Sequence, residues 1–150
     1  MVDRFEKFTI SIFEITRYWH RLATEEMAKY GLKGPQAIYL TTLYRFSDGI
    51  TAQKLSQMSG KDKADVSRML SILEEKGLVT KEGVGKNMYR AIIKLTDKGK
   101  EAAQKVSKRI ALTVDMAGKG LKEKDREAFY NALELISSNL RSLSESGLPT

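Results

Sequence analysis

The chain has 150 residues, no cysteine and one histidine, and it carries a net charge of +7 at pH 7. This composition excludes disulfides, thiolate catalysis and a histidine-rich metal site, and no apolar run approaches the roughly 18 residues that a membrane span needs. The length allows one ordinary domain with a real core. We therefore expect a cytoplasmic protein with no membrane contact and no cofactor, and the basic balance favours a polyanionic partner.

The first predicted helix runs from about Asp3 to Tyr30, and Gly31 is placed to end it. Its apolar residues recur at spacings of three and four over nearly three heptads, which is typical of an a/d seam between paired helices. This seam is broader than one small domain readily covers, so we expect it to contact a partner helix. The seam residues expected at a dimer interface are Phe8, Ile12, Ile15 and Trp19.

A second, largely buried helix is predicted after Gly34-Pro35, because Pro35 is tolerated in a first turn and apolar residues follow on several sides. The turn signal at 47–49 ends it. Thr51 is a plausible N-cap for a third helix, which leads to a tight break at Gly60. The inward stripe expected for this third helix is Ala52, Leu55 and Met58.

The fourth predicted helix begins after Asp62, a plausible N-cap, and ends before Gly77. Asp65 is interpreted as a capping residue only, because a carboxylate that faces phosphates is unfavourable. Counting 100° per residue places small and basic side chains opposite the inward face of Val66, Met69, Leu70 and Leu73. A surface of this kind lets a helix approach a base-pair edge closely. Its residues are Ala64, Ser67, Arg68 and Ser71.

Residues 78–82 and 88–95 have strand character, and Gly83 and Gly85 allow the positive φ of a hairpin turn between them. Helix, turn, helix and a two-stranded ribbon are the plan of a winged helix-turn-helix. Residues 48–100 have 11 basic and 7 acidic side chains, the largest positive excess in the chain. This module is therefore predicted to bind double-stranded DNA.

The residues expected to contact DNA are Thr51, Gln53, Lys61, Lys63, Ala64, Ser67, Arg68, Ser71, Lys81, Lys86, Asn87 and Arg90. Arg68 is expected to reach a guanine edge or a phosphate, and the alternative is an ion pair with a carboxylate such as Asp65 or Glu75. The lysines are candidates for phosphate contacts that make binding depend steeply on salt, and the alternative is plain solvated charge.

After Thr96, a predicted N-cap, two long helices follow, the second of them starting near Lys122. The last helix carries a second a/d seam with the interface candidates Phe129, Leu133, Ile136 and Leu140. Seams at both ends of the chain predict a homodimer, and the alternative is an antiparallel pair within one chain. The expected fold is mainly α with a small β-hairpin wing. Residues 34–96 are the predicted winged helix-turn-helix, and 1–33 with 97–150 are the predicted helical dimerisation region.

The segments DKADVSRML, LEEKGLV and LTDKG, together with the order of helices, make the chain resemble the MarR family of transcription regulators. The resemblance implies a triangular homodimer on a pseudo-palindromic operator, with the second helix of the module in the major groove and the wing in the minor groove. It also implies a repressor that a small aromatic or anionic effector releases from DNA. An effector pocket is one interpretation of His20 and of Tyr18, Tyr39 and Tyr44, and ordinary interface or core-edge positions are the other.

The predicted wing departs from the family pattern, in which an Asp is followed closely by an Arg. Aligned from Leu95, the chain has Asn87, Met88 and Tyr89 there. Asn87 could replace the Asp as a hydrogen-bonding residue at the tip but cannot form a carboxylate–guanidinium brace, and Arg90 or Lys86 is left to supply the minor-groove cation. No phosphate-binding glycine loop, metal-ligand spacing or activated nucleophile points to an enzyme. The alternatives to a ligand-responsive regulator are a winged-helix protein–protein interaction module and a constitutive architectural DNA-binding protein without an effector.

Overall fold

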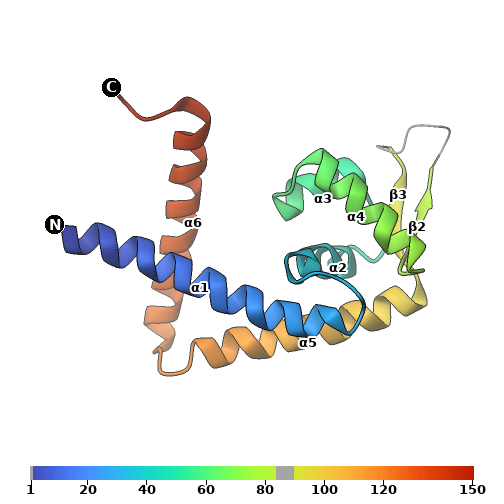
Figure 1. The fold of residues 1–150 in the computed structure, drawn as a ribbon, viewed down its shortest axis with the longest axis horizontal. Helices are drawn as coiled ribbons and strands as arrows, with labels where there is room; N and C mark the ends of the chain where they lie inside the picture. Colours follow the sequence, from blue (N-terminus) through green and yellow to red (C-terminus); the bar gives the residue numbers. More distant parts are fainter. Residues whose placement is uncertain (1, 84–89) are drawn as a thin grey trace. The chain divides into compact units, whose positions relative to one another are not determined.

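The computed structural model describes residues 2–83 and 90–150 and is mainly helical, with one small sheet (Figure 1). It forms two compact units, Met1–Ala111 and Leu112–Thr150. None of the described helices is long and apolar enough to cross a membrane. The elements in chain order are α1 (Val2–Ala28), the 3-10 helix η1 (Gly34–Gln36), α2 (Ala37–Arg45), β1 (Ile50–Thr51), α3 (Ala52–Ser59), α4 (Lys63–Glu75), β2 (Val79–Glu82), β3 (Ile92–Leu95), α5 (Asp97–Ala117) and α6 (Glu123–Ser146).

The first unit holds the predicted helix-turn-helix, and its N-caps are where the sequence places them. The Thr51 hydroxyl accepts the backbone N–H of Lys54 at 3.1 Å. The Asp62 carboxylate accepts the backbone N–H of Asp65 at 2.7 Å. Such caps satisfy backbone donors that a helix start leaves without a partner, and they fix where α3 and α4 begin.

The sheet differs from the predicted two-stranded ribbon, because three antiparallel strands lie in the order β1-β3-β2. β1 was not predicted, because two residues are too short to show the alternation that marks a strand. Ile50 of β1 is buried and pairs with Ile93 of β3. Among the described residues the second ribbon strand begins at Ile92, after Arg90 and Ala91, which were predicted to belong to it, and Met88 lies outside the described residues. Gly83 does not have the predicted positive φ.

The core of this unit joins the helix-turn-helix and the sheet to the C-terminal end of α1 and the N-terminal half of α5. The predicted inward face of α4 is confirmed, because its four residues are at most 3% exposed. Met58, predicted to face inward from α3, is instead 41% exposed. Its position follows from helix geometry: six residues after Ala52 the helix has turned about 600°, well away from the inward face. The largest fully buried side chains are Tyr39, Met27, Leu40, Leu43, Leu55, Met69, Leu73, Ile93, Val66 and Val106.

Two glycines let the supporting helices approach the module. A Cβ on Gly99, in the first turn of α5, would lie 1.9 Å from the carbonyl oxygen of Leu78. A Cβ on Gly34 would lie 2.8 Å from the backbone nitrogen of Thr24 in α1. Both distances are far below van der Waals contact, so the packing of η1 on α1 and of α5 on the start of β2 requires residues without side chains.

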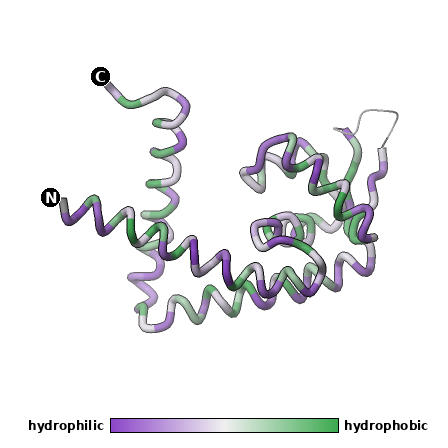
Figure 2. Tube along the Cα trace, viewed as in Figure 1, coloured by the Kyte–Doolittle hydropathy of each residue, from purple (hydrophilic) through white to green (hydrophobic). Residues whose placement is uncertain are grey.

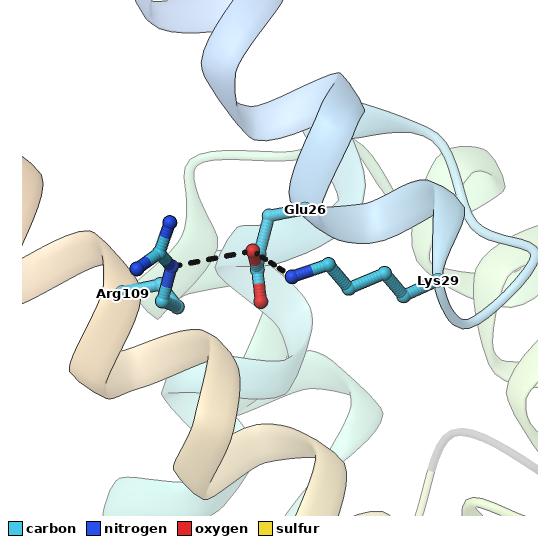
Figure 3. Close-up of polar contacts among 3 residues, drawn as sticks. All are labelled: Glu26, Lys29 and Arg109. Carbon is cyan, nitrogen blue, oxygen red and sulfur yellow. Dashed lines mark hydrogen bonds and ion pairs between the residues drawn. The ribbon is translucent and has the colours of Figure 1, made fainter.

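One carboxylate links α1 to α5 within the same unit (Figure 3). Oε2 of Glu26 lies 2.8 Å from Nζ of Lys29 on the next turn and 3.5 Å from Nε of Arg109 on α5. The Glu26 side chain is only 13% exposed. This three-residue cluster is therefore more than a pair of surface charges, because it holds the end of α1 against α5. The first compact unit includes α1 and most of α5 as well as residues 34–96. The predicted division into 34–96 and a dimerisation region therefore stays a prediction about function.

The apolar seams of α1 and α6 are left open in the single chain. Apolar residues recur along both helices (Figure 2), and α6 buries no residue over its whole length. In the second unit, Arg126 is held near the start of α6, because it donates to the carbonyl oxygen of Gly118 at 3.3 Å and pairs with Glu123 at 3.5 Å. The more exposed seam residues include Phe8 at 44%, Ile15 at 59%, Phe129 at 44% and Leu140 at 52%.

Candidate DNA-binding surface

The outer face of α4 carries the four side chains that the sequence analysis placed opposite the core. Ala64, Ser67, Arg68 and Ser71 are all exposed. The Ser71 hydroxyl donates to the backbone oxygen of Ser67 at 3.2 Å, so the Ser71 side chain lies against the helix. The Arg68 side chain is 69% exposed and is the long cationic group on this face. The face therefore combines close approach with one side chain able to donate two parallel hydrogen bonds.

Arg68 is not isolated on this surface, because its Nη2 lies 3.6 Å from Oδ1 of Asp65. The alternative weighed for Arg68, a contact with Asp65, is thus present as a loose and exposed ion pair, which is worth little to stability. The interpretation of Asp65 as a capping residue only was wrong. Its other carboxylate oxygen, Oδ2, accepts a hydrogen bond from the buried hydroxyl of Tyr39 in α2, a contact between residues 26 positions apart that no local pattern indicates.

Burial, and then the Asp65 carboxylate, raise the pKa of Tyr39 well above its ordinary value. The hydroxyl therefore keeps its proton and acts as a donor at any physiological pH. Tyr39, interpreted as a core-edge or pocket residue, is instead fully buried with no exposed surface.

The lysines predicted to contact phosphates divide into two groups. Lys63 is exposed at the start of α4, and Lys61 is half-buried in the turn before it. Lys81 on β2 does not fit the prediction, because its side chain is only 8% exposed and its Nζ lies 3.7 Å from Glu74 of α4. It packs β2 against α4, and alternation along a four-residue strand could not show that this cation faces inward.

Two predicted wing residues, Lys86 and Asn87, lie outside the described residues. Arg90 is described and exposed. Lys94 of β3 lies 3.5 Å from Glu82 of β2, so a carboxylate–ammonium pair links the two strands. Of the two residues expected at the start of α3, Gln53 is exposed and Thr51 is half-buried as a cap.

A cleft of about 260 Å³ lies beside this surface in the first unit. Its lining residues from α1, α2, the turn before α4, and α5 include Trp19, His20, Ile38, Thr41, Lys61 and Ile110. The lining combines an aromatic ring and aliphatic side chains with a cationic and a titratable group. No cluster of residues suited to a metal ion occurs in the ranges 2–83 and 90–150.

Comparison with known proteins points to one family. Residues 30–87 match the model of the MarR family, whereas no curated protein matches the sequence. A MarR transcriptional regulator from Methanosarcina mazei is similar in structure, with a TM-score of 0.76, 24% identity, and coverage of 92% of this chain and 99% of that one.

A MarR-family regulator from Listeria monocytogenes, solved in complex with a 26mer DNA, has a TM-score of 0.80 at 23% identity and covers 95% and 96% of the two chains. The MepR–DNA complex from Staphylococcus aureus has a TM-score of 0.78 at 20% identity over 88% and 97%. At these identities the structural likeness shows a shared fold. The matched segment confirms, over residues 30–87, the resemblance to the MarR family seen in the sequence, and the structural likeness confirms the winged helix-turn-helix fold.

Proposed function

We propose that the protein is a sequence-specific regulator of transcription that binds double-stranded DNA through the outer face of α4. The observation that carries the proposal is the exposed row on that face, where Arg68 stands among Ala64, Ser67 and Ser71. Small side chains bring the helix axis close to the bases, and a guanidinium recognises a guanine edge with two hydrogen bonds. Two structural relatives were solved with DNA, which supports the same use of this fold here.

The proposed assembly is a homodimer on a pseudo-palindromic operator. The 24-residue helix α6 buries no residue in the single chain. Helices in proteins gain most of their stability when an apolar face packs against a neighbour, so α6 needs a partner to cover its apolar seam. A two-fold dimer would present two copies of α4 roughly one turn of DNA apart. The residues proposed to contact DNA are those predicted from the sequence, except that Lys81 now has a structural role.

A binding measurement with one arginine variant tests this proposal. The probe is a labelled duplex that covers the region upstream of the protein's own coding sequence, with nonspecific DNA as competitor. Replacing Arg68 with Ala should weaken binding about 10- to 100-fold, since a good bidentate contact is worth about 1–3 kcal/mol. The control is Lys108→Ala, which removes the same charge from an exposed position on α5.

An Arg68→Ala variant with unchanged affinity at about 150 mM salt, where distant surface charges are screened, would contradict the assignment. If the wild-type chain binds no duplex at all, the winged helix serves another purpose, and the alternative of a protein–protein interaction module gains support. Binding that competitor DNA removes completely would favour the architectural alternative.

We further propose that a small aromatic carboxylate binds the cleft and releases the DNA, so that the protein acts as a repressor. The cleft offers Trp19 and Ile38 for an aromatic ring and Lys61 for a carboxylate. Lys61 is part of the turn that leads into α4, and its carbonyl accepts a hydrogen bond from Ser56 of α3 at 2.6 Å. A ligand on Lys61 therefore touches the joint between the two helices of the DNA-binding motif.

Thermal unfolding in the presence of benzoate tests the effector proposal. Occupancy at 100 times the dissociation constant stabilises the folded state by about 2.7 kcal/mol, which should raise the midpoint temperature by several degrees. Lys61→Ala should abolish the rise, and Lys108→Ala should retain it. A benzoate series that leaves both the melting temperature and DNA binding unchanged would refute the cleft as its site.

A further inference from the structure

The hydrogen bond between Tyr39 and Asp65 crosses from the core to the proposed DNA-binding face. Tyr39 has no exposed surface, and a buried hydroxyl without a partner is costly. The Asp65 carboxylate is the acceptor that the structure provides. Because Asp65 lies in the first turn of α4, the contact attaches the start of the recognition helix to α2.

The Asp65 carboxylate is held from more than one direction. Oδ2 accepts from Tyr39, while Oδ1 lies 3.6 Å from Arg68. The backbone N–H of the same residue is bound by the Asp62 cap at 2.7 Å. A carboxylate fixed in this way is a stationary partner for an arginine that is itself 69% exposed and would otherwise sample many rotamers.

A carboxylate on a surface that meets phosphates lowers the binding affinity for all DNA, whatever the DNA sequence. Repulsion by Asp65 and its partial neutralisation of Arg68 both lower nonspecific affinity, which is mainly electrostatic. An oriented guanidinium helps only where the correct base edge is present. The repulsion lowers affinity for both kinds of DNA alike and cancels in the ratio of specific to nonspecific affinity, so the orientation of Arg68 is what raises that ratio.

We propose that Asp65, held in place by Tyr39, is a positioning residue for Arg68 that raises DNA sequence specificity at the expense of total affinity. This inference rests on the proposed DNA-binding function of α4. It assigns to the pair a role that a purely structural contact does not have: removal of the Tyr39 hydroxyl should change the specificity ratio without a matching change in nonspecific binding.

The test uses the full chain and two duplexes of equal length, the upstream-region duplex and one of scrambled sequence. Tyr39→Phe keeps the buried ring and leaves no donor without a partner, so the fold should persist. We expect its affinity for the upstream duplex to fall about tenfold, as for a misplaced bidentate contact, with affinity for the scrambled duplex within about twofold of wild type. The matched control is Tyr44→Phe, the same change at an exposed residue of α2.

Asp65→Asn gives a second and independent measurement. The amide oxygen can still accept from Tyr39, but Arg68 loses its ionic partner. Affinity for the scrambled duplex should rise, and the slope of log K against log salt should steepen by about one because one more cation is free for phosphate. In an Arg68→Ala background neither substitution should change the specificity ratio, since the positioned group is absent.

The outcomes separate this inference from the function on which it rests. A wild-type chain that prefers the upstream duplex, with a Tyr39→Phe variant that keeps the full preference, overturns the positioning role alone. Equal losses on both duplexes, together with a lower melting temperature, also overturn it, because they show a structural contact only. A wild-type chain that binds both duplexes equally or neither overturns the proposed function and this inference together.

Discussion

The winged helix-turn-helix module and the helix α6 use their apolar residues in opposite ways. In the module, Leu55, Leu73 and Ile93 have no exposed surface and pack into one core with the ends of α1 and α5. In α6 the apolar residues are as regularly spaced, yet none of them is buried. Three-and-four spacing thus marks a buried face in α4 and an exposed apolar face in α6, and burial in the structure is what distinguishes them.

Replacing a seam residue of α6 with a charge should have the largest effect. Ile136→Glu places a carboxylate in the proposed dimer interface, where burial without a partner costs several kcal/mol, so the dimer should dissociate. Sedimentation velocity should show about half the wild-type mass, and operator binding should weaken strongly. Asn131→Glu, which adds the same charge on the polar side of the helix, should stay dimeric. An Ile136→Glu protein that remains dimeric would show that α6 is not the interface.

A cavity in the module should have the next largest effect, and it should act on folding instead of assembly. Leu73→Ala removes a side chain with no exposed surface, which should lower the free energy of unfolding by about 2–5 kcal/mol. Leu135→Ala, at a position that is 62% exposed on α6, should cost less than about 0.5 kcal/mol. Urea unfolding at one fixed protein concentration measures both, because a dimer's stability depends on concentration. Similar losses for the two variants would remove the contrast between the regions.

The smallest expected effect concerns the polar contact inside the module. The folded-state pKa of Tyr39 lies above its ordinary value of 10.0, so the folded chain keeps this proton when the unfolded chain has lost it. The contribution of Tyr39 to stability is therefore fully present below about pH 10 and is lost as the pH rises towards the folded-state pKa. The difference in unfolding free energy between wild type and Tyr39→Phe should shrink above pH 10 by up to about 1.4 kcal/mol per pH unit. A difference that stays constant between pH 9 and 11 would contradict this.

Most elements of the fold could be predicted because their signals are local. The caps at Thr51, Asp62 and Thr96 and the inward face of α4 depend on residues three or four positions apart. The feature of the fold that was not predicted depends on residues far apart in the sequence. The pairing of β1 with β3 joins residues about 40 positions apart along the chain, and a two-residue strand carries no periodicity of its own.

In the candidate site, too, the features with local signals could be predicted and those that depend on long-range packing could not. Helix periodicity alone placed Arg68 and its small neighbours on the outer face of α4. The partner of Lys81 and the attachment of Asp65 to Tyr39 depend on how α4 packs against β2 and α2. Those side chains were assigned from charge and position in the sequence, and charge does not indicate whether a cation faces solvent or a neighbouring carboxylate.

The Thr96 hydroxyl has a consequence for how motion passes through the first unit. It donates to the backbone oxygen of Gly77, just after α4, at 2.7 Å, and it accepts from the backbone N–H of Gly99 at 3.0 Å. Lys98 adds a hydrogen bond to the backbone oxygen of Lys76 at 3.1 Å. Hydrogen bonds to Lys76 and Gly77 thus join the C-terminal end of α4 to the start of α5, and they restrict relative movement more than the connecting chain alone would. A tilt at the start of α5 would therefore pass to the C-terminal end of α4 through these contacts as well as through the chain.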